Sequence, residues 1–135
     1  MPTQTAHVAI VDDDPSLRKA LERVLQSHSY ATKTYESARS FIDSLRHDTP
    51  ACLVVDLQMP EMTGLDLQHQ LRRDGIKIPT IVITAHDEGS ARQRCEAAGA
   101  LAYLLKPVQG ATLIAAIEAA TDLATTTKST SNSHL

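Results

Sequence analysis

The chain has 135 residues, a length that suits one domain with a single hydrophobic core and leaves no room for a second folded module. Apolar residues make up 42% of the composition but aromatic residues only 3%, so the core must be aliphatic, which favours a parallel sheet covered by helices. The formal net charge of -3 offers no basic surface for nucleic acid or an anionic membrane, so we expect no direct nucleic-acid contact.

Short apolar runs alternate with amphipathic segments from the N-terminal end onward. Residues 7–11 are built around Val8-Ala9-Ile10-Val11, which is apolar on both faces, as in a strand at the middle of a covered sheet. Asp14 and Pro15 follow as a helix cap and a proline at the first helical position, so we expect a helix to begin there. A second strand is predicted over 31–35 and a second helix over 37–46.

The middle of the chain repeats this alternation. Residues 51–55 and 79–84 are apolar runs of strand length, rich in β-branched side chains. Between them, residues 63–73 carry apolar side chains at helical spacing and end at Asp74-Gly75, a typical helix stop. The pattern therefore predicts two more strands with a helix between them.

The last third of the chain is patterned less strongly. Residues 88–98 offer only small or weakly apolar side chains to a core, so this fourth helix should be the most loosely held. A fifth strand is predicted over 101–105 and a fifth helix over 111–123. The polar residues 125–135 are expected to form a linker or a disordered tail, which leaves residues 1–124 as the folded domain.

Five strand-helix pairs predict an α/β fold with right-handed crossovers. The standard five-strand solution is a doubly wound, flavodoxin-like, three-layer domain with a parallel sheet in the order 2-1-3-4-5. In such folds ligands bind beyond the carboxyl ends of the strands. The functional residues are therefore expected to follow the strands.

Cysteine usage and hydropathy bear on the cellular compartment. Cys52 and Cys95 are the only cysteines and lack metal-ligand spacing, so free thiols are expected. No apolar stretch approaches the ~20 residues that cross a bilayer, and residues 1–7 lack the regions of a signal peptide. We expect a cytoplasmic protein without membrane contact.

Charged and hydroxyl side chains follow the central strands. Asp12 and Asp13 follow the first strand, Asp56 the third and Lys106 the fifth, while Thr84 ends the fourth. Because the carboxyl ends of parallel strands share one edge of the sheet, these side chains should converge. Clustered carboxylates repel one another, so they either raise a pKa or bind a cation, and hard oxygen ligands suit Mg²⁺.

This cluster has the parts that phosphoryl transfer requires. Asp56 can attack phosphorus as an oxygen nucleophile and form an acyl phosphate, while a cation and Lys106 offset charge on the transferring group. Thr84 could donate a hydrogen bond to a phosphoryl oxygen. Plain turn roles for Asp12 and Asp13 stay open as alternatives, and Asp14 is interpreted as a helix cap rather than a ligand.

At these residues the chain resembles the response-regulator receiver family of two-component systems, in order, from residue 7 to about 120. Ser37-Ala38, Phe41 and Cys52 look like the nitrogen-fixation type of transcriptional regulator, whose output is a LuxR-type helix-turn-helix. The matching motifs are Ile10-Val11-Asp12-Asp13-Asp14, Val55-Asp56-Leu57-Gln58-Met59-Pro60, Ile83-Thr84-Ala85, Gly99-Ala100 and Tyr103-Leu104-Leu105-Lys106-Pro107.

The resemblance implies a function and a ligand set. A sensor histidine kinase would be the partner and Asp56 the phosphoryl acceptor. Asp13 and Asp56 would ligate Mg²⁺ directly, Asp12 mainly through water, and Gln58 through its backbone carbonyl. The chain would be a signalling receiver that promotes its own phosphorylation and dephosphorylation, and not an enzyme in the ordinary sense.

The resemblance also implies a switch. Thr84 and Tyr103 would be the switch pair, which reshapes the face made by the fourth helix, fifth strand and fifth helix, and the Lys106-Pro107 bond would be cis. We expect phosphorylation to promote homodimerisation through that face. The output would be either a following transcriptional domain or protein contact by a stand-alone receiver. Val108, where the family usually has phenylalanine, and Gly89 depart from the family pattern.

Three other functions compete with this interpretation. A haloacid-dehalogenase phosphatase would need a second aspartate at the position of Gln58, and a flavodoxin would need a Thr- and Ser-rich loop in place of Asp12 and Asp13. A receiver-like interaction module that no longer accepts phosphate is the third. Retention of Asp56 and Lys106 argues against that module.

Overall fold

The computed structural model describes residues 6–133, with side chains described for residues 6–121. At its centre is a five-stranded parallel sheet in the order β2-β1-β3-β4-β5, which confirms the predicted flavodoxin-like arrangement. Each strand lies within one residue of its predicted bounds. The strands are β1 His7–Val11, β2 Ala31–Tyr35, β3 Cys52–Asp56, β4 Thr80–Thr84 and β5 Ala100–Leu105.

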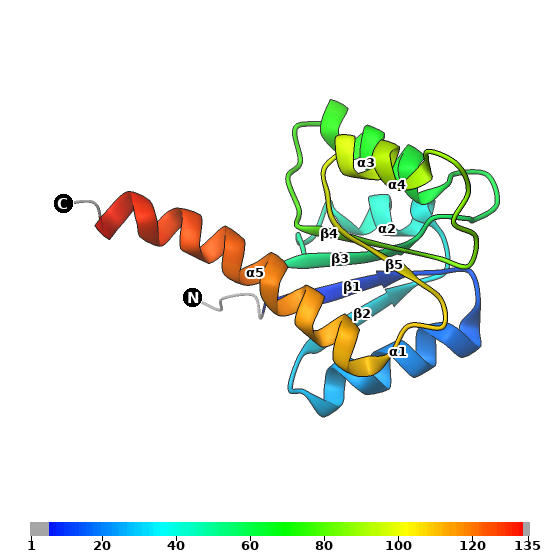
Figure 1. The fold of residues 1–135 in the computed structure, drawn as a ribbon, viewed down its shortest axis with the longest axis horizontal. Helices are drawn as coiled ribbons and strands as arrows, with labels where there is room; N and C mark the ends of the chain where they lie inside the picture. The colour runs from blue at the N-terminus through cyan, green and yellow to red at the C-terminus, as the bar shows by residue number, and fades with distance from the viewer. Residues whose placement is uncertain (1–5, 134–135) are drawn as a thin grey trace.

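Helices cover both faces of the sheet and complete a three-layer domain. Helices α1 and α5 lie on one face, and α2, α3 and α4 lie on the other (Figure 1). Every residue of β1, β3 and β4 is buried, which explains why these strands are apolar on both faces. The helices are α1 Pro15–Ser27, α2 Ala38–Ser44, α3 Gly64–Arg73, α4 Ala91–Ala97 and α5 Gly110–Ser133.

Side chains cap three of these helices at their N-terminal ends. The carboxylate of Asp14 accepts hydrogen bonds from the first turn of α1, which confirms its predicted role as a cap. Ser37 caps α2, and Thr63 forms a reciprocal capping box with Asp66 at the start of α3. Ser90 precedes α4 but makes no such bond. Helix α4 therefore lacks the N-terminal side-chain cap that α1, α2 and α3 have.

Two helices differ from their predicted bounds by three residues or more, whereas α2 ends two residues before its predicted end. Helix α4 begins at Ala91 instead of residue 88, because Gly89 has a φ of 49° and turns the chain out of the right-handed helical region. Helix α5 continues to Ser133 and not only to residue 123, since residues 124–133 contain neither glycine nor proline to interrupt it. Part of the expected tail is thus helical, and its role as a linker stays a prediction.

The remaining structural expectations concern the cysteines and the membrane. Cys52 and Cys95 are both free and buried, as predicted. Within the residues that the structure describes, none of the helices combines the length and the hydropathy that a transmembrane span requires.

Candidate functional site

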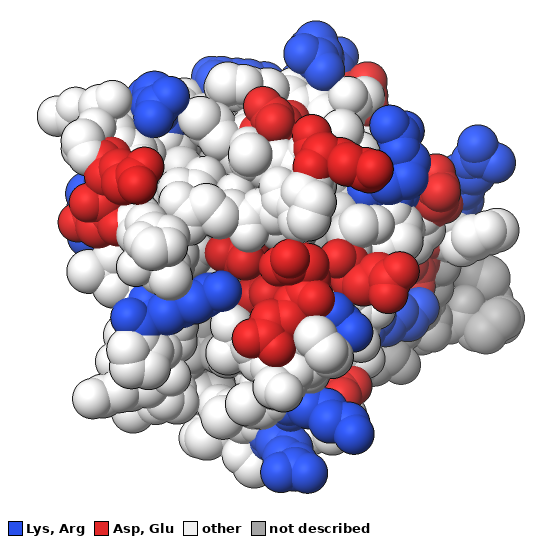
Figure 2. Space-filling model, turned by 90° about the vertical axis from the view of Figure 1, so that its right-hand side faces the viewer, with Lys and Arg blue, Asp and Glu red and all other residues white. Residues whose placement is uncertain are grey.

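The carboxyl ends of β1 and β3 lie side by side, since the two strands pair in parallel with Val11 opposite Val55. The strand order reverses here, because β2 is added on one side of β1, whereas β3, β4 and β5 follow on the other side. Ligands of doubly wound folds bind at such a point. Figure 2 shows acidic side chains gathered at the centre of the face where the strands end.

Three carboxylates come together at this point, as the sequence predicted. One oxygen each of Asp12, Asp13 and Asp56 lies within 4.8 Å of the others. Asp12 is fully buried and Asp56 is 3% exposed, whereas Asp13 faces solvent. Two buried carboxylates and a third at the surface form a cluster whose mutual repulsion needs an opposite charge.

The ammonium group of Lys106 supplies part of that charge. Its Nζ lies 3.2 Å from Asp12 Oδ2 and 3.3 Å from Asp56 Oδ2, so it bridges the two buried carboxylates. Burial would lower the pKa of Lys106, but the charges of Asp12 and Asp56 outweigh it and hold the pKa above its usual value. Lys106 is therefore cationic at neutral pH and aimed into the cluster.

The acceptor candidate has a strongly perturbed acidity. Burial, and then the negative charge of Asp12, raise the pKa of Asp56 to about 6, although Lys106 and the backbone N–H of Gln58 oppose the shift. The positive charge of Lys106 alone therefore does not offset the effects of burial and of Asp12 on the Asp56 carboxylate. Perturbed carboxyl groups of this kind concentrate at functional sites.

Backbone contacts fix the positions of the carboxylates. Asp12 Oδ1 accepts a hydrogen bond from the backbone N–H of Asp14, and the Asp12 carbonyl accepts one from Arg18 at 2.7 Å. Next to the Asp56 backbone, a Cβ added to Gly64 would lie 2.6 Å from the Asp56 carbonyl oxygen. Glycine is required there because α3 starts directly against the backbone that carries the Asp56 side chain.

Thr84 is buried, and its hydroxyl is already engaged. Thr84 Oγ1 lies within donating distance of Gln58 Oε1, at 2.9 Å, and of the His86 carbonyl, at 3.0 Å. The His86 backbone N–H donates to the same oxygen. The hydroxyl has one proton for two acceptors, so Gln58 competes for the group that the sequence analysis assigned to a phosphoryl oxygen.

Tyr103 is 4% exposed and lies on the same face of the sheet as α4. Its hydroxyl donates to Asp87 Oδ1 at 3.2 Å, and the guanidinium of Arg92 lies 5.0 Å from the ring centroid. Burial, and then the bond to Asp87, raise the pKa of Tyr103. The ring is thus held inward at both its face and its hydroxyl.

The donor set suits a hard divalent cation. Asp12 Oδ2 is buried and, among the described residues, has no hydrogen-bond donor of good geometry, although Lys106 lies at ion-pair distance. Two buried carboxylates beside the exposed Asp13 would leave one side of a bound ion open to water, as Mg²⁺ requires. The residues present therefore fit a divalent metal site.

The structure brings together most of the predicted site residues. Asp12, Asp13, Asp56 and Lys106 form one cluster, while Thr84 is linked to it through Gln58. The Lys106-Pro107 bond is cis, as the resemblance implied.

Two residues that contact Tyr103 were missed by sequence reasoning. Asp87 precedes α4, and Arg92 lies in the first turn of that helix. No periodicity or motif in the sequence pairs either one with Tyr103. The only available signal was that Asp87 follows Thr84 by three residues, in the loop after a central strand.

Comparisons with known proteins agree with this geometry. The chain matches the sequence profile of the response regulator receiver domain over residues 8–118. It is 34% identical to response regulator protein TodT of Pseudomonas putida over 92% of this chain and 55% of TodT. It is 36% identical to transcriptional regulatory protein FixJ of Rhizobium meliloti, over 90% of this chain and 59% of FixJ. The chain thus spans little more than half the length of these curated relatives.

Solved structures are similar over a comparable range. A crystal structure of FixJ-N aligns with a TM-score of 0.81 and 36% identity, and covers 89% of this chain and 96% of that one. A low-resolution structure of the response regulator StyR aligns with a TM-score of 0.85 and 34% identity, over 96% of this chain and 65% of StyR.

Proposed function

Because the chain belongs to the response regulator receiver family of two-component signalling proteins, we propose that Asp56 accepts a phosphoryl group from a sensor histidine kinase. The observation that carries this proposal is the convergence of Asp56 with two further carboxylates and Lys106 at the end of the central strands. The cytoplasm, where a kinase of this type would meet its receiver, is the proposed location.

The proposed metal ion is Mg²⁺. Asp13 and Asp56 would hold it directly, Asp12 mainly through water, and Gln58 through its backbone carbonyl. When bound, the ion neutralises carboxylate charge and stabilises negative charge on a transferring phosphoryl group. Two observations support this assignment. The cluster joins two buried carboxylates to one exposed carboxylate, and the pKa of Asp56 is raised although Lys106 lies beside it.

In the proposed reaction, an oxygen of Asp56 forms a bond to phosphorus as the bond from phosphorus to the kinase histidine nitrogen breaks. Lys106, already aimed at Asp56 and Asp12, would stabilise charge on the phosphoryl oxygens. The chain would position the reacting groups and neutralise their negative charge, since phosphoryl transfer needs little other help from a protein. The product is an acyl phosphate that can later be hydrolysed at the same site.

We propose that Thr84 and Tyr103 convert the covalent change into a change of shape. The Thr84 hydroxyl would leave Gln58 and donate to a phosphoryl oxygen, which frees the adjoining loop and α4 to move. Helix α4 suits this role because it has seven residues, no side-chain cap and only two buried residues. Tyr103 lies beneath it and would report the shift through its contacts with Asp87 and Arg92.

The proposed output is a homodimer formed through the face of α4, β5 and α5, which would control a transcriptional domain outside the described residues. Leu105 on β5 is 48% exposed, an apolar contribution to that face. Relatives such as FixJ are about 1.7 times as long as the matched region, from the 59% coverage of FixJ, which leaves room for an output domain in those proteins. Equal sedimentation of the free and fluoroberyllate-treated protein would count against the dimer.

Intact-mass analysis after incubation with acetyl phosphate and Mg²⁺ tests the acceptor directly. We expect the mass of one phosphoryl group to be added to the native chain and not to Asp56→Asn. Lys106→Ala serves as a second variant, which should bind Mg²⁺ but acquire the adduct much more slowly. An adduct that persists in Asp56→Asn would show that another residue is the acceptor.

A further inference from the structure

The two ends of helix α4 are held by different parts of the molecule. Near its N-terminal end, the Arg92 guanidinium lies 5.0 Å from the ring centroid of Tyr103, and the Tyr103 hydroxyl donates to Asp87 in the preceding loop. In the same loop, the backbone N–H and carbonyl of His86 both lie within hydrogen-bond distance of the Thr84 hydroxyl. The contacts at this end therefore lead to Thr84 and Tyr103, the two residues of the proposed switch.

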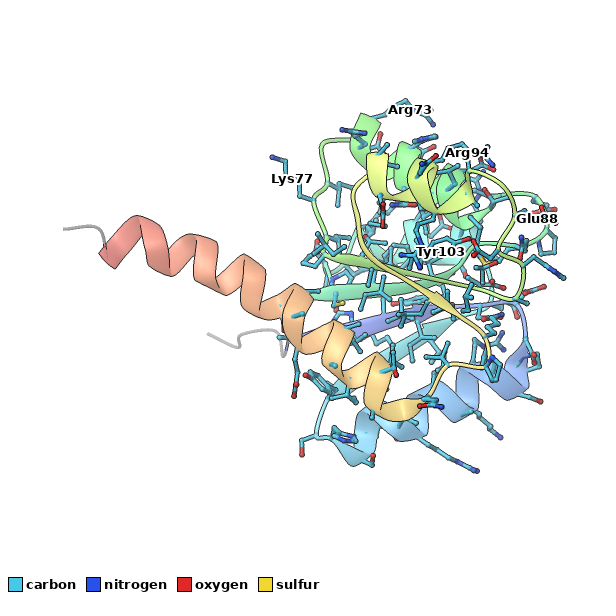
Figure 3. All side chains as sticks on the ribbon, in the orientation of Figure 1. Arg73, Lys77, Glu88, Arg94 and Tyr103 are labelled. Carbon is cyan, nitrogen blue, oxygen red and sulfur yellow. The ribbon has the colours of Figure 1, made fainter. Side chains whose placement is uncertain are left out.

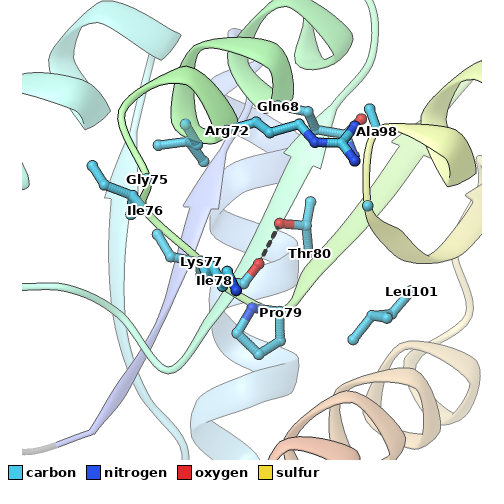
Figure 4. A pocket seen from close by; sticks show the side chains of 12 residues that line it. Gln68, Arg72, Gly75, Ile76, Lys77, Ile78, Pro79, Thr80, Ala98 and Leu101 are labelled. Atoms are coloured by element: carbon cyan, nitrogen blue, oxygen red, sulfur yellow. Dashed lines mark hydrogen bonds between the residues drawn. The ribbon is translucent and has the colours of Figure 1, made fainter.

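The C-terminal end of α4 is held from α3 instead. Gln68 Nε2 donates to the Cys95 carbonyl at 3.1 Å, and the guanidinium of Arg72 donates to the Ala97 carbonyl at 3.0 Å. Figure 4 shows that the side chains of Gln68 and Arg72 extend from α3 toward Ala98, the residue after the helix. Neither Gln68 nor Arg72 is assigned to the phosphorylation site, so phosphorylation would not act on these two bonds directly.

Side chains do not fill the space beside these two hydrogen bonds. A pocket of about 430 Å³ lies between α3, the loop that follows it and the turn between α4 and β5. Its lining includes Gln68 and Arg72 of α3 and, beyond the end of α4, Gly99 and Leu101. Leu101 is left 46% exposed. Because side-chain packing is incomplete here, the end of α4 depends on the hydrogen bonds from α3.

The bond from Gln68 is also shielded from water. Gln68 is 4% exposed, and its bond to Cys95 is buried, so water does not compete for it. Its Oε1 is buried as well and has no hydrogen-bond donor among the residues that the structure describes. An unpaired buried amide oxygen costs free energy that an apolar side chain of the same size would avoid. What the amide contributes at this position is the bond to the end of α4.

From this asymmetry we propose that Gln68 and Arg72 are positioning residues, which make the C-terminal end of α4 the pivot of the switch. The inference rests on the proposed function, in which the Thr84 hydroxyl moves to a phosphoryl oxygen. The N-terminal end of α4 would then swing away from Tyr103, while both bonds from α3 stay intact. Because α4 has only seven residues, it would turn as one body, and its first turn would move farthest.

Fluoroberyllate, a phosphoryl mimic, tests the pivot through differences in affinity, which amide chemical shifts in the loop after Asp56 can follow. A contact that persists in both states leaves the affinity unchanged, whereas a contact that the switch breaks weakens binding. Gln68→Met removes the bond to α4 and an unpaired acceptor at similar side-chain length, so it should bind fluoroberyllate within about twofold of the native affinity. Tyr103→Phe removes only the hydroxyl that donates to Asp87. It should bind about fivefold more tightly, as expected when the switch breaks one hydrogen bond.

Hydrogen exchange of the unbound protein tests whether the two bonds hold the helix end. The amides of Ala98 and Gly99 donate to carbonyls in the last turn of α4, so they report its opening. Gln68→Met and Arg72→Gln should each speed their exchange by about three- to fivefold. Arg73→Gln is the matched control, since it removes the same charge from the same exposed end of α3 (Figure 3), but Arg73 bonds within its own helix. It should change these rates by less than about twofold.

Three outcomes would overturn the inference: about fivefold tighter fluoroberyllate binding by Gln68→Met, native affinity in Tyr103→Phe, or exchange at the end of α4 that the loss of either bond leaves unchanged. In each case the native chain still binds fluoroberyllate, so the proposal for Asp56 stands. A native chain that does not bind fluoroberyllate would overturn the proposed function and this inference together.

Discussion

Helices α1 and α4 both follow a buried strand, but their ends are held very differently. Helix α1 has thirteen residues, a proline in its first turn and the Asp14 cap, and it buries Leu21 and Leu25. Helix α4 has seven residues, no side-chain cap, and only Ala91 and Cys95 buried. Side chains from other elements hold it instead, with Gln68 and Arg72 at its C-terminal end and Tyr103 beneath Arg92.

In the proposed function, this difference separates a rigid support, α1, from a helix that would shift, α4. Helix α1 begins just after Asp12 and Asp13, so its rigidity keeps two of the three clustered carboxylates in place. Helix α4 follows the loop that contacts Thr84. The few hydrogen bonds that other elements make to this loop can break and re-form at a small cost in free energy. The proposed phosphorylation would need carboxylates held in fixed positions, and the proposed signalling would need a helix that can shift.

The largest effect is expected in the core beneath α1. Leu25→Ala removes a fully buried side chain and should lower the free energy of unfolding by about 2 to 5 kcal/mol. Cys95→Ala, the matched change beneath α4, removes one sulfur atom and should cost only about 1 kcal/mol. Urea denaturation followed by circular dichroism measures both. If the two variants lost equal free energies of unfolding, α1 and α4 would not differ in how strongly they are packed.

The next effect concerns the acidic cluster that α1 supports. Burial raises the pKa of Asp56 from 3.8 to about 6, so the folded protein binds this proton more tightly than the unfolded chain does. Stability from this group is therefore present below pH 4 and is lost as the pH rises toward 6. Asp56→Asn should remove that loss and raise the free energy of unfolding at pH 7 by about 1 to 3 kcal/mol without metal.

Denaturation of the native chain and Asp56→Asn between pH 4 and 8 measures this effect. The two stability curves should diverge as the pH rises through about 4 to 6 and then run parallel. Mg²⁺ should narrow the gap by stabilising the native chain alone. A gap that does not change with pH would contradict the cause given for the pKa shift.

Gln58→Met tests the hydrogen bond between Gln58, which lies beside the acidic cluster, and Thr84, which precedes the loop to α4. It removes the acceptor that competes for the Thr84 proton while keeping a side chain of similar length. Since one neutral hydrogen bond is worth about 1 kcal/mol, fluoroberyllate should bind about five times more tightly in the variant. Tyrosine fluorescence can follow the titration because the chain contains no tryptophan. Unchanged affinity would mean that the His86 carbonyl already holds the proton.

The smallest effects sharpen the comparison at the helix starts. Asp14→Ala removes two capping hydrogen bonds from α1 and should cost about 1 kcal/mol. Ser90→Ala removes no capping bond from α4 and should change the free energy of unfolding by no more than about 0.5 kcal/mol. Thermal denaturation of the two variants side by side gives the measurement. A Ser90→Ala loss as large as that of Asp14→Ala would show a cap on α4 in solution.

Much of the fold follows from local patterns in the sequence. The apolar runs predicted all five strands within one residue, and Asp14 with Pro15 predicted the start of α1. Parallel strands bring their carboxyl ends to one edge, so strand assignment alone predicted that Asp12, Asp13 and Asp56 meet. Periodicity, turn chemistry and strand polarity are properties of neighbouring residues, which is why a single sequence carries them.

Other features were decided only by the tertiary structure. The bonds from Thr84 to Gln58, from Tyr103 to Asp87 and from Gln68 to Cys95 join residues 26, 16 and 27 positions apart, and no local pattern specifies them. The pocket beside Leu101 likewise depends on how closely α3 and α4 approach one another. Sequence periodicity determines which face of a helix is buried. Which polar partner each side chain meets there is set by the packing of elements that lie far apart in the chain.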